Sequence, residues 1–274
     1  MIVDLHCHSY YSDGDCSPEE LLDIALANQV NMLALTDHDC MDGYWHLKRL
    51  AKGKPIRIIP GLECSVTWQR QELHVLGLNI DPEHPRLNRY LVAQAQRRWQ
   101  RALQITALLQ KIGIEGSLQG VMQIAGHQNI SRTHYAKWLV DMQIVNDSAS
   151  AFKQYLGSRA CAYAPPQWAS LEETIAVIKE AGGHAVLAHP MHYSLSTAGL
   201  KGLFRAFKTH GGEGVELISG LMAVKDVGKL KKLVDFFDLK VSTGSDFHRK
   251  QIYRASLGKQ TSVPDDIIPI WQDW

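Results

Sequence analysis

The sequence predicts an α/β protein in which seven strands, parallel or mostly parallel, close into a (β/α)7 barrel that carries an inserted all-helical subdomain. Seven short apolar segments bounded by Gly or polar residues run along the chain, and helical patterns separate most of them. Seven strands within 274 residues favour a barrel over an open sheet. One stretch of the chain, from Asp81 to about Ala160, has helical patterns only.

The first predicted strand covers residues 2–5, and an amphipathic helix is predicted over 17–29. Ser17, Pro18 and Glu20 mark the start of this helix as a capping box, in which the Ser and Glu side chains each bond the backbone N–H of the other residue. The remaining predicted strands are 31–36, 56–63, 72–79, 184–189, 214–219 and 239–245, with further helices over 171–183 and 225–237. In such folds the side chains that carry chemistry gather at the carboxyl ends of the strands.

The insertion is predicted to contain four helices, over 86–113, about 119–125, 132–142 and 148–156. The segment 81–160 has ten Lys and Arg against five Asp and Glu, a net charge of +5, whereas the whole chain has +1 and the remainder therefore about −4. We expect a first part of the barrel in 1–80, a helical insertion that caps the active site in 81–160, and a second part of the barrel in 161–274.

The composition is that of an ordinary soluble protein, with 21% charged and 45% hydrophobic residues, and its net charge gives no global sign of a polyanion-binding protein. The five cysteines are odd in number and none is in a CxxC pair, which favours a reducing compartment. No segment resembles a secretory signal, and no window approaches the roughly 18 apolar residues that span a bilayer. We expect a cytoplasmic protein that does not contact membranes.

The motif DLHCHSYYSDG, which begins at Asp4, places two histidines one residue apart. Because successive side chains of a strand alternate between its faces, His6 and His8 point the same way and Cys7 points oppositely. Two imidazoles on one face can share a metal ion, although such a pair alone also arises by chance.

Further His, Asp and Glu residues stand at or near the ends of the other predicted strands, in TDHD, GLE, LHVLG, AHP and GSDFH. Together with the first motif they make nine candidate metal ligands: His6, His8, Asp13, His38, Glu63, His74, His189, Asp246 and His248. Nitrogen and carboxylate ligands that converge at one end of a barrel are typical of a multinuclear metal site. Asp37, Asp39 and Asp42 are expected to support this site or to cap helices, because ligand histidines need an acceptor on their second nitrogen.

The motifs DLHCHSYYSDG, TDHD, PGLE, AHP and GSDFH resemble the polymerase and histidinol phosphatase (PHP) family of metal-dependent phosphoesterases. Similarity continues through GLNID, SRTHYAKWLV, YAPPQW and GGHAVLAHP to the branch of bacterial 3′,5′-nucleoside bisphosphate phosphatases and 5′-to-3′ exoribonucleases. This resemblance implies a distorted seven-stranded barrel with two or three divalent ions, manganese first, with zinc or iron as alternatives.

The resemblance also implies how the ligands are shared. One ion would take His6, His8, Glu63 and Asp246; a second would share Glu63 and add His74 and His189; a third would use Asp13, His38 and His248. Hydrolysis would proceed by attack of a metal-bound hydroxide, without a covalent intermediate.

The segment SRTHYAKWLV corresponds to a family segment that lies over the metals. Arg132 is expected to hold a phosphate, since its guanidinium is a two-pronged donor. His134 is expected to contact substrate or to act as general acid, so that the predicted catalytic residues are His134, Asp13 and His248. His192 stands where relatives often have an arginine, and it is the third predicted substrate contact.

The leading functional hypothesis is hydrolysis of the 3′-phosphate of nucleoside 3′,5′-bisphosphates, stepwise 5′-to-3′ removal of nucleotides from 5′-phosphorylated single-stranded RNA, or both. Tyr10, Tyr11 or Trp68 could stack a base of such a substrate, and the basic insertion could follow an RNA backbone. The alternatives are a histidinol-phosphate phosphatase and a non-catalytic metal-stabilised module. No protein partner is predicted.

Overall fold

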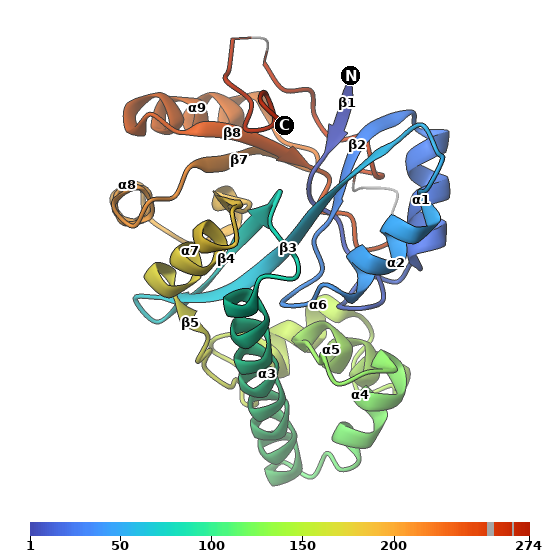
Figure 1. The fold of residues 1–274 in the computed structure, drawn as a ribbon. Coiled ribbons are helices and arrows are strands. Elements are labelled where there is room, and N and C mark those ends of the chain that lie inside the picture. Colours follow the sequence, from blue (N-terminus) through green and yellow to red (C-terminus); the bar gives the residue numbers. More distant parts are fainter. Residues whose placement is uncertain (251–254, 265) are drawn as a thin grey trace.

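A computed structural model describes residues 1–250, 255–264 and 266–274 (Figure 1). Its strands form one sheet in the order β1-β2-β3-β4-β6-β7-β8, with β5 beside β3. The strands are β1 (Ile2–Asp4), β2 (Val30–Leu35), β3 (Arg57–Trp68), β4 (Gln71–Leu78), β5 (Ala169–Ser170), β6 (His184–Leu187), β7 (Gly214–Ser219) and β8 (Lys240–Gly244). The helices are α1 (Pro18–Ala27), α2 (Asp42–Leu50), α3 (Pro85–Lys111), α4 (Ser117–Ala125), α5 (Arg132–Asp141), α6 (Ser148–Ala151), α7 (Leu171–Glu180), α8 (Thr197–Thr209) and α9 (Val224–Phe237).

The chain around β1 closes the sheet against β8 and the residues that follow it. Leu5 N–H donates to the Thr243 carbonyl at 3.0 Å, and Asp246 N–H donates to the His6 carbonyl at 2.9 Å. These bonds join the two ends of the strand order, so the sheet is a nearly closed, distorted barrel. The predicted fold class, a (β/α)7-type barrel with helices outside it, is confirmed.

The β3–β4 connection differs from a regular (β/α) unit, because β4 runs antiparallel to both β3 and β6. A two-residue turn joins β3 to β4, and both of its residues, Gln69 and Arg70, have positive φ (46° and 66°). Turns of this kind usually contain Asn or Gly, so no local sequence pattern indicates the hairpin. One consequence is that His74, in the first half of β4, pairs with Ser65 near the carboxyl end of β3.

Helices α3 to α6 lie between β4 and β5 and pack around a cluster of their own, below the barrel in Figure 1. Tyr135 is fully buried at the centre of this cluster, and its hydroxyl donates to the Ala102 carbonyl at 2.7 Å. A π-helical turn, Phe152–Leu156, continues α6. The predicted helices of the insertion are therefore present, while its division from the barrel at residues 81 and 160 stays a prediction.

Helix α3 ties the insertion to the barrel through buried polar contacts. The Gln94 amide donates to the Ser65 carbonyl at 2.7 Å, and the Arg98 guanidinium forms an ion pair with Asp39. Both contacts are buried. Removing one partner of the Arg98–Asp39 pair would leave a buried charge unpaired, which destabilises a protein by about 3–5 kcal/mol. The predicted supporting role of Asp39 therefore concerns the position of α3.

The last residues of the chain close the barrel end that lies away from the strands' carboxyl ends. Ile270 N–H donates to the Val241 carbonyl at 2.8 Å, and Val241 N–H donates to the Ile268 carbonyl at 3.0 Å, so this segment adds to β8. The Ile270 side chain packs with Val3 and Met32 inside the barrel, and Trp271 and Trp274 pack against the same cluster. Among the described residues no helix is both long and apolar enough to cross a membrane.

We predict that Ile270→Ala lowers the free energy of unfolding by about 2–5 kcal/mol, because it leaves a cavity among buried side chains. Ile268→Ala is the matched control, since Ile268 is 62% exposed whereas Ile270 is 1% exposed. Urea unfolding of both variants measures the difference. Equal losses of stability would contradict the role given to the C-terminal segment.

Candidate metal centre

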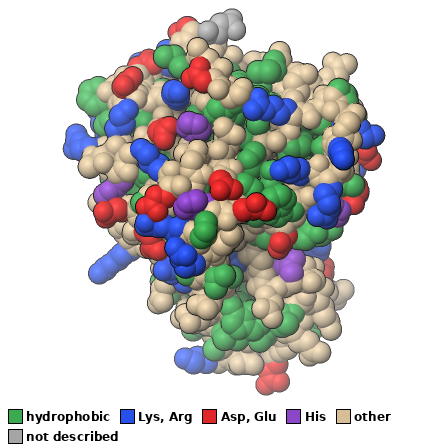
Figure 2. All heavy atoms as spheres, in the orientation of Figure 1, with side chains coloured by type: hydrophobic (Ala, Val, Ile, Leu, Met, Phe, Trp, Pro, Cys, Tyr) green, Lys and Arg blue, Asp and Glu red, His purple; other side chains and the backbone are tan. Residues whose placement is uncertain are grey.

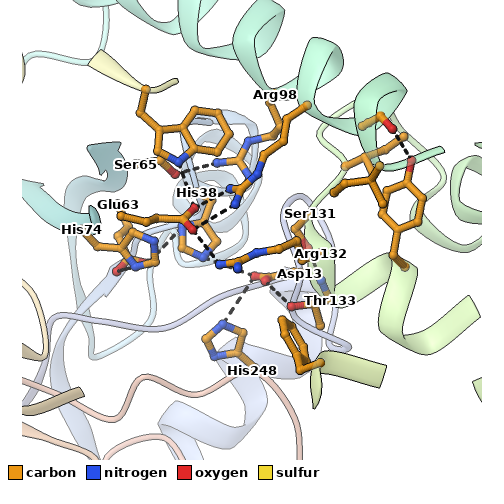
Figure 3. A pocket seen from close by; sticks show the side chains of 18 of the residues that line it. Asp13, His38, Glu63, Ser65, His74, Arg98, Ser131, Arg132, Thr133 and His248 are labelled. Carbon is orange, nitrogen blue, oxygen red and sulfur yellow. Dashed lines mark hydrogen bonds and ion pairs between the residues drawn. The ribbon is translucent and has the colours of Figure 1, made fainter. Parts of the chain in front are cut away.

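All nine predicted ligands lie together at one end of the barrel. They come from the chain after β1 (His6, His8, Asp13), after β2 (His38), from β3 (Glu63) and β4 (His74), and from the chain after β6 (His189) and β8 (Asp246, His248). The carboxyl ends of parallel strands meet at this edge, and the reversed direction of β4 brings His74 to the same edge. Figure 3 labels Asp13, His38, Glu63, His74 and His248 among the side chains around one cavity.

Glu63 lies at the centre of the group and is 1% exposed. Its Oε1 lies 3.0 Å from His74 Nδ1 and 2.9 Å from His189 Nε2. Its Oε2 lies 3.3 Å from His6 Nε2, 3.2 Å from His8 Nε2 and 3.1 Å from His38 Nδ1. One carboxylate thus faces five imidazoles, with some near each of its two oxygens. This arrangement fits a carboxylate that binds one cation with each oxygen.

Asp246 completes the first predicted group of ligands. Its Oδ1 lies 3.5 Å from both His6 Nε2 and His8 Nε2, and these two ring nitrogens are 3.1 Å apart. Two atoms that bind the same ion at about 2.1 Å are separated by roughly 3.0–3.4 Å at octahedral or tetrahedral angles. The separations in this group therefore fit ligands of one ion.

Asp13 lies at the centre of the remaining group. Its Oδ1 lies 3.4 Å from His248 Nε2 and 3.7 Å from His38 Nε2, and His8 Nδ1 is 3.9 Å away. This buried oxygen accepts no hydrogen bond from any residue that the structure describes. A buried carboxylate oxygen surrounded by nitrogens at these distances fits a further divalent cation, and Mn²⁺, Zn²⁺ and Fe²⁺ all accept such ligands.

The three carboxylates remain ionised in this buried site. Burial acts to raise their pKa values, but the surrounding histidines outweigh it and hold the pKa of Asp13, Glu63 and Asp246 well below the usual range. Burial also lowers the pKa of His38 to about 3. For His8, burial lowers the pKa but hydrogen bonds to Asp246 and Glu63 outweigh it and raise the value to about 10. The site therefore requires positive charge next to its carboxylates.

Glu216, on β7, supports two of the candidate ligands and was not predicted from the sequence. It is fully buried; its Oε1 accepts from His6 Nδ1 at 2.9 Å, and its Oε2 accepts from the His189 backbone N–H at 2.7 Å. The first bond leaves the lone pair of His6 Nε2 directed at Glu63. Gly244 makes room for this contact, because a Cβ there would lie 2.9 Å from Glu216 Oε1.

Three residues at the strand ends have backbone conformations that are rare without glycine: Asp39 (φ 49°), His189 (φ 28°) and Asp246 (φ 49°). Left-handed backbone at such residues is unfavourable by about 1–3 kcal/mol each, and it is typical of functional sites. Here this backbone conformation directs His189 and Asp246 toward the cavity and Asp39 toward Arg98.

The loop that carries Asp13 is held by Asp37. Asp37 Oδ1 accepts from Ser9 N–H at 2.8 Å and from Ser12 Oγ at 2.6 Å. Asp42 begins α2. Neither of these aspartates contacts a ring nitrogen at hydrogen-bond distance in the described structure; the acceptors seen are Glu216 for His6 and the Asp246 carbonyl for His248 Nδ1, at 2.9 Å.

A cavity of about 280 Å³ lies above the candidate ligands, and three arginines of the insertion line it: Arg98, Arg101 and Arg132. Arg132 Nη2 donates to Glu72 Oε2 at 2.6 Å, and Arg101 Nη1 donates to Glu72 Oε1 at 2.6 Å. Figure 3 shows Arg98 and Arg132 directed from the insertion toward Glu63 and His38. Only Arg132 was predicted; Arg98 and Arg101 lie in a helical pattern without any motif.

These arginines explain part of the basic excess of the insertion. Figure 2 shows few charged side chains over the insertion on the face in view, and charges of both signs mixed over the barrel. Three of the ten basic residues point into the cavity. The face in view offers no basic tract, so we relate the charge of the insertion to the cavity.

The predicted stacking residues Tyr10, Tyr11 and Trp68 do not line this cavity. The Tyr11 hydroxyl lies 3.2 Å from His46 Nδ1. The aromatic side chains that line the cavity are instead Tyr135, Phe152 and Trp168 together with the histidines; the Trp168 ring lies 4.8 Å from the Arg98 guanidinium carbon.

His192 lines the cavity, with its ring stacked on His189 at a centroid distance of 5.2 Å. His134 differs from the prediction, because its ring is used to cap α5: its Nδ1 accepts from the Ser131 N–H at 3.0 Å. Burial lowers the pKa of His134 to about 4, so the ring is neutral at neutral pH, and it is not among the residues that line the cavity. The geometry therefore does not favour His134 as general acid.

We predict that Glu216→Gln weakens the binding of divalent ions by about 10- to 100-fold, as is usual when a partner of a metal ligand is removed. The glutamine side chain has one oxygen, which can accept from either His6 Nδ1–H or the His189 backbone N–H. Its NH2 group would then face the other N–H, which has no acceptor. Isothermal titration with Mn²⁺ and metal content after dialysis measure the change.

The control for this variant is Glu213→Gln. Glu213 lies just before β7 and pairs with His184 at 2.7 Å, outside the candidate centre. Unchanged metal affinity in the Glu216 variant, with the fold intact by circular dichroism, would contradict the supporting role.

A family model described as the PHP domain matches residues 4–185. The 5'-3' exoribonuclease Rnm of Escherichia coli is 37% identical to this chain over 100% of the chain and 94% of its own length. The 3',5'-nucleoside bisphosphate phosphatase of Chromobacterium violaceum is 38% identical over 99% of this chain and 95% of its own length.

Among solved structures, an amidohydrolase from Chromobacterium violaceum with bound sulfate superimposes with a TM-score of 0.93. It is 38% identical to this chain, and the match covers 99% of this chain and 95% of that chain. The family match spans well over half of the sequence, and the relatives match along nearly all of it. The chain therefore belongs to the PHP family of metal-dependent phosphoesterases, and it is a hydrolase.

Proposed function

We propose that this protein hydrolyses the 3′-phosphate of nucleoside 3′,5′-bisphosphates and removes nucleotides in the 5′-to-3′ direction from 5′-phosphorylated single-stranded RNA. The observation that carries the proposal is one cavity in which three arginines face seven of the nine candidate ligands, while the other two, His6 and His8, lie buried against Glu63 and Asp246. The names of the E. coli and C. violaceum relatives, an exoribonuclease and a bisphosphate phosphatase, support both activities.

The nine side chains would hold two or three divalent ions, with Mn²⁺ as the first candidate. His6, His8, Glu63 and Asp246 would share one ion, Glu63, His74 and His189 a second, and Asp13, His38 and His248 a third. When bound, the ions supply neutralisation of charge on the phosphoryl oxygens and a water of lowered pKa. Asp13 and His248 are catalytic in this scheme through the third group.

The arginines favour a substrate with a second phosphate. Within the described part of the chain, Arg98, Arg101 and Arg132 form ion pairs with two carboxylates, Asp39 and Glu72, so these five side chains carry a net charge of +1. Glu72 holds Arg101 and Arg132 side by side. Arg101 donates to Glu72 through both Nη atoms and to the Ala164 carbonyl through Nε, whereas Arg132 donates to Glu72 through Nη2 alone. Within the described structure Arg132 therefore keeps its Nε–H and Nη1–H groups for a phosphate. The 5′-phosphate of a bisphosphate or of an RNA end would bind there, while the phosphorus to be attacked lies over Glu63.

This positive charge disfavours histidinol phosphate, because its ammonium group would lie near the arginines and be repelled by them. Histidinol phosphate also has no second phosphate for the arginines to bind. A complete set of candidate ligands beside an open cavity likewise disfavours a non-catalytic module. We place the protein in the cytoplasm, because all five cysteines are free thiols and none is paired.

The test of the proposed function is phosphate release by the purified protein with Mn²⁺ from three substrates in parallel. We expect release from adenosine 3′,5′-bisphosphate and mononucleotides from a 5′-phosphorylated RNA oligomer, with little release from histidinol phosphate. Preference for histidinol phosphate, or no hydrolysis of any of the three by protein shown to contain metal, would overturn the proposal.

We predict that Arg132→Ala raises KM for adenosine 3′,5′-bisphosphate by about 10- to 100-fold, because a charge-assisted hydrogen bond contributes about 1.5–3 kcal/mol. Adenosine 3′-monophosphate has no second phosphate, so on this substrate the variant and the wild type should differ by less than about threefold. Arg89→Ala, at an exposed arginine of α3 outside the cavity, is the control. A similar loss on both substrates would contradict the assignment of Arg132 to the second phosphate.

A further inference from the structure

A second, smaller cavity of about 190 Å³ adjoins the candidate centre; we call it the side chamber. It is lined by Ser219, Gly220 and Leu221 after or at the end of β7, by Ser245 after β8, and by His192, Asp246 and Ala255. His192 and Asp246 also line the main cavity, so these two residues separate neighbouring cavities. The side chamber thus lies next to the site where the attacked phosphorus would lie.

The side chamber and the arginines lie on opposite sides of the candidate metal ligands. Arg98 contacts Ser65 on β3, and Arg101 and Arg132 contact Glu72 on β4. The side chamber instead lies at the ends of β7 and β8, which are two or three strands away from β3 and β4 in the order of the nearly closed barrel and so lie across the barrel from them. A phosphorus held over Glu63 therefore has the arginines on one side and the side chamber on the other.

The two proposed reactions differ in one substituent on the phosphorus. In both, the oxygen of a water bonds to phosphorus, the bond from phosphorus to the 3′-oxygen breaks, and that oxygen leaves with a proton. In a bisphosphate the remaining substituents are oxygens only, and inorganic phosphate is released. In RNA one of them carries the 5′-carbon of the next nucleotide, so the phosphate stays on the shortened RNA.

We propose that the side chamber holds the ribose of the second nucleotide of an RNA substrate, and that it therefore determines whether this site cleaves phosphodiesters as well as terminal phosphates. This inference rests on the proposed function. A first nucleotide bound with its 5′-phosphate at the arginines leaves only the opposite side open for the chain that continues. The chamber, at about 190 Å³, is smaller than the main cavity of about 280 Å³, so we assign it the sugar and not the whole nucleotide.

The lining of the side chamber fits this occupant. Ser219 is 6% exposed, and its hydroxyl has no hydrogen-bond partner among the described residues, so it is available to a ribose hydroxyl or a phosphodiester oxygen. Gly220 has φ 62°, and a Cβ there would lie 3.2 Å from the Ser245 carbonyl oxygen. Glycine thus keeps this wall free of a side chain. A site that holds the sugar and leaves the base outside would act on any sequence.

The experiment adds bulk to the side chamber and compares two substrates. Leu221 is 61% exposed, so Leu221→Trp is compatible with folding, and Ser219→Leu fills the chamber from within. We expect each variant to lower the ratio of kcat/KM for a 5′-phosphorylated RNA oligomer to that for adenosine 3′,5′-bisphosphate by about tenfold or more. Val224→Trp is the matched control, because Val224 is 88% exposed and does not line the chamber, and its ratio should not change.

An unchanged ratio in the Leu221 variant, or equal losses on both substrates in folded protein, would overturn the inference. A wild-type protein that hydrolyses the bisphosphate but no RNA would overturn the inference and leave the phosphatase activity standing. A wild-type protein loaded with metal and inactive on both substrates would overturn the proposed function together with the inference.

Discussion

The buried carboxylate of Glu63 is the interaction on which the rest of the site depends. Imidazoles from five separate positions lie 2.9–3.3 Å from its two oxygens. An ionised carboxylate with 1% exposure is unfavourable unless positive charge surrounds it, and only a closed barrel brings that charge from β1, β2, β4 and β6 to β3. The candidate centre therefore exists only where the sheet is closed. On the side of β7 and β8, Glu216 binds His6 and the backbone of His189, and Gly244 leaves room for this contact.

The barrel supplies the candidate ligands, whereas the insertion supplies the arginines. The ion pair of Arg98 with Asp39 and the contacts of Arg101 and Arg132 with Glu72 fix these helices over the barrel opening. The same contacts set the charge on that side of the cavity. In the proposed function, the barrel would bind the reacting phosphorus of the substrate and the insertion would bind its second phosphate. The side chamber adds a third region, and it lies opposite the arginines.

The sequence predicted the barrel class and the meeting of all nine candidate ligands, because strand ends converge by geometry and the residues at those ends carry motifs. It did not predict that β4 is antiparallel, since Gln69 and Arg70 form a turn that normally contains Asn or Gly. Glu216, Arg98, Arg101 and Glu72 were missed because their partners are distant in the chain and no local pattern marks them. The role predicted for His134 stays a prediction, and the structure adds a local contact that the sequence did not reveal: its ring caps the helix that carries it.

Anomalous scattering from crystals soaked with Mn²⁺ tests the central claim most directly, because it locates the ions themselves. We expect two or three Mn²⁺ positions in the cavity, with at least one about 2.0–2.3 Å from a Glu63 oxygen and bonded to imidazoles of two or more strands. An anomalous map at saturating Mn²⁺ with no ion in contact with Glu63 would contradict it.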